Sequence, residues 1–595
     1  MPPLLIYDGK CGFCRIWLEY WRKLTGDRVK YAASQDVGGQ FPQIPKAAFG
    51  HGVQLVRPDG SVASGARAVF ETLGRQRLYE SSPLIARPAE FTYGIIASNR
   101  GFFYWVTRIL FGKAVEPARF ALTQWLFLRG LAVVYAIAFA SLGTQVTGLI
   151  GERGISPVAQ FFGQVAASLP GVDRYFAVPS LLWLNTSDLI LQYGCWLGFS
   201  LALVLLFARM ERAVLIALYA LYLSFCLAGQ EFLLFQWDAL LLETGFLAIF
   251  FGRTVTTQRT LAWLFRWLVF RLYFLSGWVK IDSGDPTWLN FTALDFHYWT
   301  QPLPNRISWY AAQLPEWAQH ASTFGVLALE LAAPFLIFLP RRPRMLGAFG
   351  LLSLQALIFA TGNYTFFNIL AVALTLFLFD DQALRGCFAW LSQRITESRP
   401  SPRASKLAAA ALTLTMLPLG LARLLEQVSP PSQPGPLERA LTYTSPFQLV
   451  NSYGLFAVMT TSRPEIVVEG SNDGVSWQAY EFRYKPGDVN RAPPFVAPHQ
   501  PRLDWQMWFA VLSDFRNNLW FLRFVDRLLE GSPGVTALLE KNPFAGRPPQ
   551  YIRAQLYEYR FTSSSTLART GAWWTREFRG EYLPAVGRRT GAAAK

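Results

Sequence analysis

The chain has 595 residues, of which 52% are hydrophobic, 15% aromatic and 16% charged. Soluble domains usually carry about 25% charged residues, more than this chain does. The chain is too apolar to be disordered, and it has more apolar residues than one soluble core can bury. The 55 Lys and Arg against 39 Asp and Glu give a net charge of +16. Together with long apolar runs, this charge predicts basic loops on one side of a lipid bilayer rather than a nucleic-acid partner. Five cysteines are too few for a secreted scaffold built on disulfides.

Residues 1–90 are expected to form an α/β domain that carries a dithiol. Leu4–Tyr7 reads as a short buried strand, a turn follows, and Cys11 and Cys14 then open an amphipathic helix. A thiol at a helix N-terminus is favoured as thiolate, so Cys11 is the expected attacking sulfur and Cys14 the resolving one. Further along, the pattern predicts a hairpin and a helix, over 52–63 and 65–73.

The pattern Tyr7-Asp8-Gly9-x-Cys11-x-x-Cys14 resembles the DCC family of thiol-disulfide oxidoreductases. The resemblance implies a thioredoxin-like fold for residues 1–90 and a catalytic pair made by Cys11 and Cys14. Two other interpretations stay open, a redox-inert relic and half of a zinc site, for which His51 is the only further ligand nearby. We predict no metal and no other cofactor.

Nine apolar segments within residues 119–425 are long enough to cross a membrane. They are 123–143, 189–208, 213–229, 232–251, 260–281, 322–340, 345–361, 365–380 and 405–425. Met1–Ile6 is too short for a signal peptide, so we expect a cytosolic N-terminus. Residues 91–118 and 426–436 are expected to be linkers, the second of them rich in proline.

The charges of the loops between these segments alternate as the positive-inside rule requires. With the N-terminus inside, the outer loops carry only Arg153, Arg174 and Arg306. The inner loops carry fifteen basic residues, namely Arg100, Arg108, Lys113, Arg119, Arg209, Arg212, Arg253, Arg259, Arg341, Arg342, Arg344, Arg385, Arg394, Arg399 and Arg403. This pattern predicts an integral multi-pass membrane protein whose C-terminal domain is extracytoplasmic.

Polar side chains fall inside the predicted fourth and fifth spans. They are Gln236, Asp238, Glu243, Arg266, Arg271 and Lys280. Depth along the two helices places Glu243 and Arg271 at mid-membrane, so we predict an ion pair between them, with Asp238 beside Lys280. The set is either a group of structural interhelical bonds or the wall of a polar pocket.

The predicted outer loop, residues 282–320, is rich in aromatic residues and proline. Such a loop suits an interfacial belt or a cover over the polar pocket, and it contains Asp295, His297 and Gln301. His297 and His320 lack the spacing of metal ligands.

Residues 437–595 are predicted to form a mainly-β domain. Strands are expected over 455–460, 465–469, 478–484, 551–561 and 573–578, and the turn at 473–474 resembles that of discoidin-type β-sandwiches. Helical insertions over 503–512 and 519–529 carry Asp504, Trp505 and Trp508, which are candidates either for contact with a client protein or for core packing. The expected architecture is thus multi-domain: a thioredoxin-like α/β domain, a polytopic helical bundle and a sandwich-like β domain.

Five strings carry a second resemblance, which covers residues 117–584. They are Phe235-Gln236-Trp237-Asp238-x-Leu240-Leu241-Leu242-Glu243, Asp295-Phe296-His297-Tyr298-x-Thr300-Gln301-Pro302, Asn451-x-Tyr453-Gly454, Arg502-Leu503-Asp504-Trp505-Gln506-Met507-Trp508 and Tyr551-Ile552-Arg553-Ala554-Gln555-Leu556-Tyr557. The chain resembles the lipase maturation factor family. That resemblance implies a factor of the endoplasmic-reticulum membrane that assists folding and assembly of exported lipases and performs no turnover reaction. The fused dithiol domain, without eukaryotic targeting, points instead to a bacterial inner membrane.

A third resemblance rests on another string, Tyr273-Phe274-x-x-Gly277-x-x-Lys280-Ile281-Asp282, which is similar to the membrane core of vitamin K-dependent gamma-carboxylase. It implies Lys280 as a base that acts on a lipid-soluble substrate. Three hypotheses therefore stand: a maturation factor with an accessory CxxC domain, a membrane enzyme based on Lys280, and a thiol-linked electron carrier. The carrier would need a quinone, because no cysteine falls on the predicted outer side.

Overall fold

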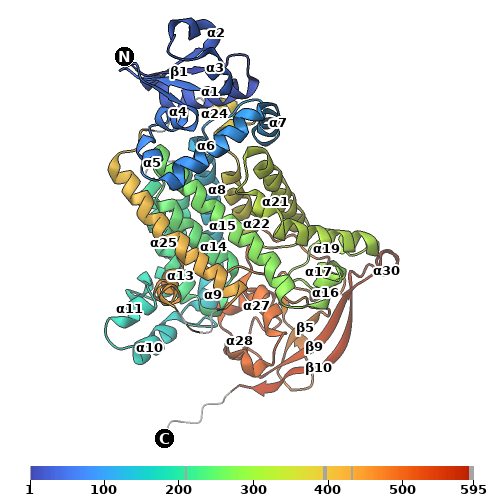
Figure 1. Ribbon diagram of the computed structural model, residues 1–595. Helices are drawn as coiled ribbons and strands as arrows, with labels where there is room; N and C mark the ends of the chain where they lie inside the picture. The colour runs from blue at the N-terminus through green and yellow to red at the C-terminus, as the bar shows by residue number, and fades with distance from the viewer. Residues whose placement is uncertain (1, 208–210, 393–398, 431–432, 434, 589–595) are drawn as a thin grey trace. The chain divides into compact units, whose positions relative to one another are not determined.

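The computed structural model describes residues 2–207, 211–392, 399–430, 433 and 435–588 (Figure 1). It divides into two compact units. The first unit contains Met1–Arg119 and Phe338–Leu346, and the second contains Phe120–Ile337 and Gly347–Lys595. Arg209 and Arg394 of the charge count, residue 208 of the second predicted span and residues 431–432 and 434 of the proline-rich linker lie outside the described residues.

The first unit is built on a four-stranded sheet with the order β2-β1-β3-β4. Strand β2 runs parallel to β1, β3 runs antiparallel to β1, and β4 pairs antiparallel with β3. The strands are β1 (Leu4–Tyr7), β2 (Lys30–Ala33), β3 (Gln54–Val56) and β4 (Val62–Ser64). The predicted first strand and the predicted hairpin are both confirmed.

The helices of the first unit begin where local chemistry favours a start. In α1 (Gly12–Thr25), Cys11 is the N-cap, and its sulfur accepts the backbone N–H of Cys14 at 3.3 Å. Leu18 of α1 is buried against Leu5 and Leu55 of the sheet. Helix α4 (Gly65–Thr72) follows the hairpin, as predicted. Much of the expected linker, residues 91–118, is helical and belongs to α6 (Pro83–Ser98) and α7 (Arg100–Phe111).

Five helices of the described chain are long and apolar enough to cross a membrane. They coincide with the first, second, third, seventh and ninth predicted segments: α8 (Ala121–Gly143), α12 (Asp188–Phe207), α13 (Glu211–Ala228), α21 (Arg341–Thr361) and α25 (Arg403–Val428). Length and apolar composition thus support five spans among the described residues, and the count of nine stays a prediction.

The other four predicted segments are helical but shorter, broken or more polar. Helix α14 (Gln236–Ile249) has 14 residues and α22 (Phe367–Thr375) has 9. The sixth segment is divided between α19 (Glu316–Leu331) and α20 (Ala333–Leu336). Helix α15 (Val255–Asp282) has 28 residues, and buried charges lower its hydropathy.

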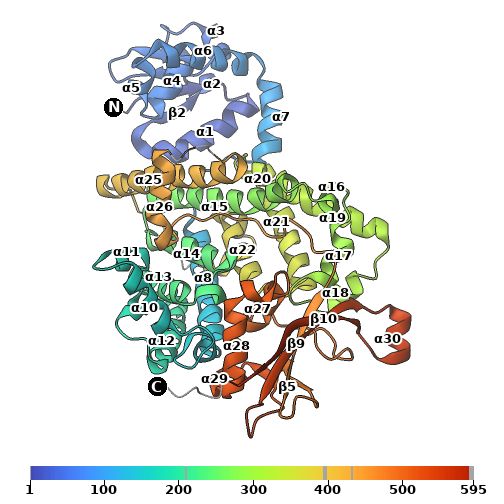
Figure 2. The same cartoon turned by 90° about the horizontal axis from the view of Figure 1, so that it is seen from below.

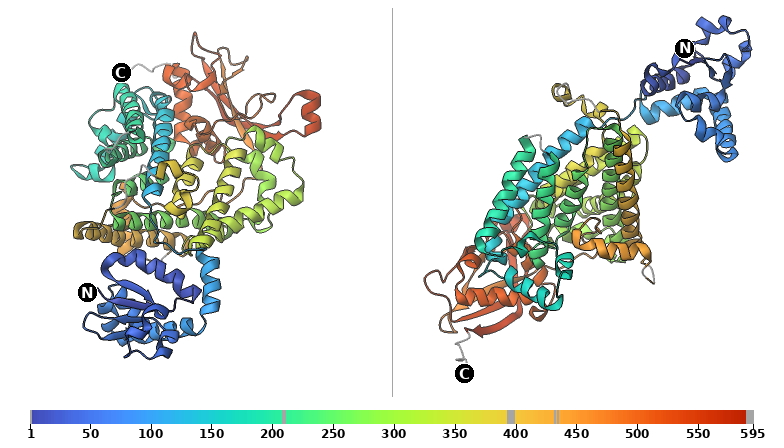
Figure 3. Two further views of the ribbon diagram at one scale, coloured as in Figure 1. Left: turned by 90° about the horizontal axis from the view of Figure 1, so that it is seen from above. Right: turned by 90° about the vertical axis from the view of Figure 1, so that its left-hand side faces the viewer.

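The C-terminal part of the second unit is rich in strands and lies at one end of that unit's helices (Figures 2 and 3). A four-stranded sheet has the order β10-β9-β5-β6, and β7 pairs with β8 in a separate two-stranded sheet. The bounds are β5 (Pro464–Ser471), β6 (Gln478–Ala479), β7 (Glu481–Phe482), β8 (Leu539–Lys541), β9 (Tyr551–Phe561) and β10 (Trp574–Gly587). Helices α27 (Arg502–Ala510) and α28 (Leu519–Glu530) confirm the predicted insertions.

The prediction of a strand over residues 455–460 is wrong. This segment is a loop whose backbone groups bond to side chains of the outer loop rather than to another strand. The carbonyl of Phe456 accepts the indole N–H of Trp288 at 2.9 Å, and the N–H of Met459 donates to Asp285 Oδ2 at 2.8 Å. Apolar alternation in this loop therefore reflects packing, since Met459 and Trp288 share one buried cluster.

Candidate functional site

The predicted ion pair between Glu243 of α14 and Arg271 of α15 is confirmed. Both side chains are buried, with 0% of Glu243 and 2% of Arg271 exposed. An uncompensated charge at such a place would be strongly unfavourable, so each residue depends on the other.

A segment from beyond the last long helix completes this pair. The backbone N–H of Asn451 donates to Glu243 Oε2 at 2.9 Å, and the hydroxyl of Tyr453 donates to the same oxygen at 2.8 Å. Arg271 Nη1 in turn donates to the carbonyl of Asn451 at 3.0 Å. Gln236 accepts the N–H of Gly454 at 3.0 Å. Two of the strings singled out in the sequence, 235–243 and 451–454, are thus halves of one buried contact.

Asp238 pairs with Arg502 of α27, and the prediction that it neighbours Lys280 is wrong. Arg502 donates from Nη2 to Asp238 Oδ1 at 2.9 Å and from Nη1 to Oδ2 at 3.0 Å. Both side chains are 1% exposed. Tyr222 of α13 donates to Asp238 Oδ1 at 2.5 Å. The two-pronged geometry is the strongest that a carboxylate and a guanidinium form, and it fixes α27 to α14.

Lys280 pairs instead with Glu330 of α19, at 2.8 Å between Nζ and Oε2. Its ammonium group also donates to the carbonyl of Ser276 at 2.9 Å and lies 5.1 Å from the ring centre of Trp288. The pair lines a cavity of about 380 Å³ whose other walls are mostly aliphatic and aromatic. Arg266, by contrast, lies away from this cavity and donates to the carbonyl of Phe377 at 2.8 Å.

His297 lines the same cavity, whereas Asp295 and Gln301 do not. His297 Nε2 lies 2.9 Å from the hydroxyl of Tyr364. Asp295 faces His320, at 3.3 Å, and Gln301 donates to the carbonyl of Thr361 at 2.8 Å. The outer-loop candidates therefore serve separate contacts rather than one shared constellation.

A second buried charge group, absent from the predicted residues, holds the outer loop to the sheet. Arg463 and Lys485 lie 2.8 and 2.9 Å from the two carboxylate oxygens of Glu465. Arg463 also donates to the carbonyls of Trp299 and Gln301, at 2.8 and 2.5 Å. Arg463 and Glu465 are two residues apart, but Lys485 and the carbonyls of the outer loop come from other parts of the chain, so no local motif marks the whole group.

Two of the three candidates for client contact are interior residues. Asp504 accepts the backbone N–H groups of Tyr484 and Lys485 at 2.8 and 2.9 Å, and burial raises the pKa of its carboxyl group. Trp505 is 3% exposed and packs edge-on against Trp237 of α14, with 4.8 Å between ring centres. Trp508 is partly exposed, and its indole donates to the carbonyl of Thr300 at 2.8 Å. Asp504 and Trp505 thus serve the packing of the C-terminal part, and contact of Trp508 with a client stays a prediction.

The dithiol lies in the first unit. Both cysteines are free and partly exposed. Burial raises the pKa of the Cys14 thiol to about 12, with the neighbouring Cys11 acting in the same direction and Arg100 opposing it. Cys14 is thus held as a protonated thiol beside Cys11, whose sulfur caps the helix. Among the described residues, no group of three or more His, Cys, Asp or Glu is placed to hold a metal ion.

Comparisons with known proteins agree over most of the chain. A family model described as the lipase maturation factor transmembrane domain matches residues 122–386, and one described as the lipase maturation factor C-terminal domain matches 449–584. Lipase maturation factor 2 of Gallus gallus is 36% identical, over 78% of this chain and 81% of the relative. Lipase maturation factor 1 of Mus musculus is 35% identical, over 79% of this chain and 89% of the relative. No solved structure matches significantly.

Replacing Glu243 by Gln should destabilise the second unit, because Arg271 then keeps a buried charge without a counterion. Breaking such a buried pair costs about 3–5 kcal/mol. The matched control is Glu211→Gln, whose partner Arg129 lies 3.3 Å away in a partly exposed pair. This control should cost less than about 1 kcal/mol. Thermal unfolding of the purified protein in detergent measures both, and equal losses would contradict the role assigned to Glu243.

Proposed function

Since the chain belongs to the lipase maturation factor family, we propose that it is a membrane-embedded factor that assists folding and assembly of exported, lipase-like client proteins. One observation carries this proposal: three of the strings that carry the family resemblance, 235–243, 451–454 and 502–508, converge on one buried framework, in which Glu243–Arg271 and Asp238–Arg502 join the helices to the C-terminal part. These charged groups are engaged with each other. They therefore suit a rigid scaffold better than a set of reacting groups.

The edge strand β10 is the surface best suited to a client. It has 14 residues, ends the sheet on one side and is exposed along most of its length. An unpaired edge offers backbone donors and acceptors to an added strand, which an incompletely folded client can supply. Phe578, in the middle of β10, is 55% exposed and adds an apolar contact.

The proposed topology has nine crossings, with the first unit's N-terminal part in the cytosol and the C-terminal part outside. The five long apolar helices support it, and α14, α15, α19 with α20, and α22 supply the remaining helical segments. We place the protein in a bacterial inner membrane, where the client would be an exported protein. The basic inner loops of the sequence support this orientation.

The first unit is proposed to be an accessory thioredoxin-like domain whose Cys11–Cys14 dithiol is redox-active. The sheet order β2-β1-β3-β4, with only β3 antiparallel to the others, supports that fold. The position of Cys11 at the N-terminus of α1 supports the role of attacking sulfur, since its sulfur accepts the backbone N–H of Cys14 at 3.3 Å.

A second candidate function is an enzyme that acts on a lipid-soluble substrate in the cavity beside Lys280. The cavity's size and its apolar walls favour such a ligand. The contacts of Lys280 with Glu330 and Ser276, however, occupy its ammonium group and favour a structural role over that of a base.

Labelling from outside should reach a tag at the C-terminus and leave a tag at the N-terminus untouched. The reason is that an odd number of crossings separates the two ends. An impermeant reagent applied to sealed cells with a permeable outer envelope makes the measurement, and lysed cells, where both tags react, are the control. Equal reactivity of both tags in sealed cells would contradict the topology.

Replacing Phe578 by Lys should lower the activity of a co-expressed, secreted lipase severalfold, because a charge on an edge strand opposes strand addition. The control is Val475→Lys, since Val475 is 81% exposed in the same region but lies beyond β5, at the opposite side of the sheet. Lipase activity is measured at equal levels of both variants. Full activity with Phe578→Lys would exclude β10 as the client surface.

Lys280→Arg should keep client assistance, whereas Lys280→Ala should lose it together with thermal stability, because Glu330 is left buried without a partner. Secreted lipase activity and unfolding temperature are measured in parallel. Loss of activity in both variants, with unfolding unchanged, would instead support catalysis by Lys280.

A further inference from the structure

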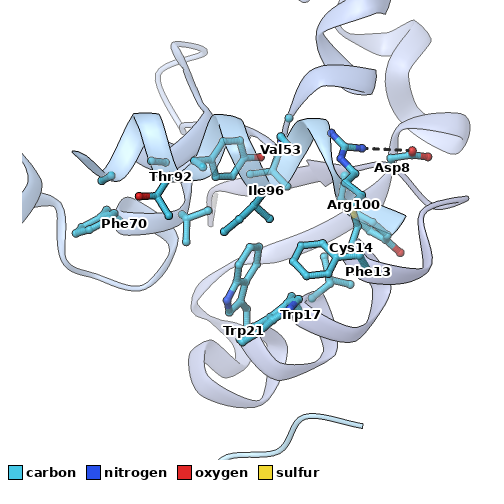
Figure 4. A pocket seen from close by; sticks show the side chains of 18 of the residues that line it. Asp8, Phe13, Cys14, Trp17, Trp21, Val53, Phe70, Thr92, Ile96 and Arg100 are labelled. Atoms are coloured by element: carbon cyan, nitrogen blue, oxygen red, sulfur yellow. Dashed lines mark hydrogen bonds and ion pairs between the residues drawn. The ribbon is translucent and has the colours of Figure 1, made fainter. Parts of the chain in front are cut away.

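A cavity of about 570 Å³ lies within the first unit, directly beside the dithiol (Figure 4). Helix α1 forms one wall with Phe13, Trp17 and Trp21, and α6 faces it with Thr92 and Ile96. A cavity of this size and apolar character is typical of sites for small organic ligands.

The charged side chains that line the cavity lie together at one end (Figure 4). Cys14 lines it there, together with Asp8 and Arg100, whose charged groups lie 3.7 Å apart. Figure 4 shows the contact between Arg100 and Asp8, and Arg100 also donates from Nη2 to the carbonyl of Gly50 at 2.8 Å, which holds the guanidinium at this end. A ligand that fills the cavity would thus place its apolar body among the aromatic rings and a polar atom near Cys14 and Arg100.

We propose that the cavity binds a quinone and that the Cys11–Cys14 dithiol reduces it. The two S–H bonds break and one S–S bond forms between Cys11 and Cys14. The two electrons and two protons pass to the quinone, whose two carbonyl oxygens become the hydroxyls of a hydroquinone. Arg100 is placed to donate to a ring oxygen as negative charge develops there.

Three features favour a quinone over a peptide disulfide as the oxidant. The walls are apolar and aromatic, which suits a flat ring, and Cys14 presents a protonated thiol to the interior. The first membrane helix begins at Ala121, soon after α7 ends at Phe111, so the unit is tethered at a bilayer where quinones dissolve. Exposed apolar side chains on α6 and α7 suit such a surface: Leu84, Phe91, Phe102, Trp105 and Ile109.

This inference rests on the redox activity proposed for the dithiol and is independent of client assistance. The test uses the reduced full-length protein in detergent without oxygen, with a short-chain ubiquinone as probe. Ubiquinone has a fully substituted ring, so thiol addition to the ring is disfavoured and electron transfer is the expected reaction. Tryptophan fluorescence reports binding, because Trp17 and Trp21 line the cavity.

We expect saturable quenching, loss of two of the five thiols for each quinone reduced, and a mass lower by two hydrogens with no adduct. In a Cys11→Ser/Cys14→Ser variant the quinone should still bind but should not be reduced. Ala97→Phe fills the cavity and should raise the half-saturating concentration roughly tenfold or more. Its control is Ile95→Phe on the same helix, since Ile95 is 43% exposed and does not line the cavity.

Oxidation of each variant by diamide separates the two proposals. If diamide forms the Cys11–Cys14 disulfide but ubiquinone neither binds nor reacts, the quinone site is overturned and the redox activity stands. If Ala97→Phe and Ile95→Phe bind ubiquinone equally well, the cavity is not the site. If neither oxidant forms the disulfide in the folded protein, the redox activity fails together with the quinone inference.

Discussion

The second unit depends on the pairing of charges that are hidden from water. Glu243, Arg271, Asp238 and Arg502 are all between 0% and 2% exposed, and each would be severely destabilising alone. Removing a charge from water costs several kcal/mol, which only a partner at hydrogen-bonding distance offsets. The helices can therefore pack in this way only when the C-terminal part supplies Arg502 and the backbone of Asn451.

This dependence makes the C-terminal part a structural component of the helical bundle rather than an appended domain. Asn451 and Tyr453 close the Glu243–Arg271 pair, and Arg463 holds the carbonyls of the outer loop. The division of the chain into compact units agrees, since the helices from Phe120 onward and the β-rich part fall into one unit. A scaffold fixed at several buried points can present the long edge of β10 in a constant position, as a surface for other chains requires.

The sequence was sufficient for contacts that follow from local order or from depth along a helix. The N-cap of α1 is predictable because Cys11 directly precedes the helix that it caps. The pairing of Glu243 with Arg271 is predictable because the two residues lie at the same depth along two consecutive helices. The same reasoning failed for Asp238, since its partner Arg502 lies 264 residues away, outside the predicted spans. The prediction of a strand over 455–460 was wrong for a related reason. Alternation of apolar and polar residues indicates which side chains are buried, but it does not indicate which backbone groups pair.

The dithiol and the proposed client surface on β10 fall into different compact units of the chain. In the second unit, Cys195 and Cys226 are buried within α12 and α13, and Cys387 is exposed, and none of the three lies in the described C-terminal part that carries β10. The described C-terminal part that carries β10 therefore offers no thiol of its own for disulfide exchange with a client. A small diffusible electron carrier, as proposed for the dithiol, fits the apolar cavity beside Cys14. The proposed client assistance would rest on strand pairing at β10, which accords with a framework whose charges are already engaged with one another.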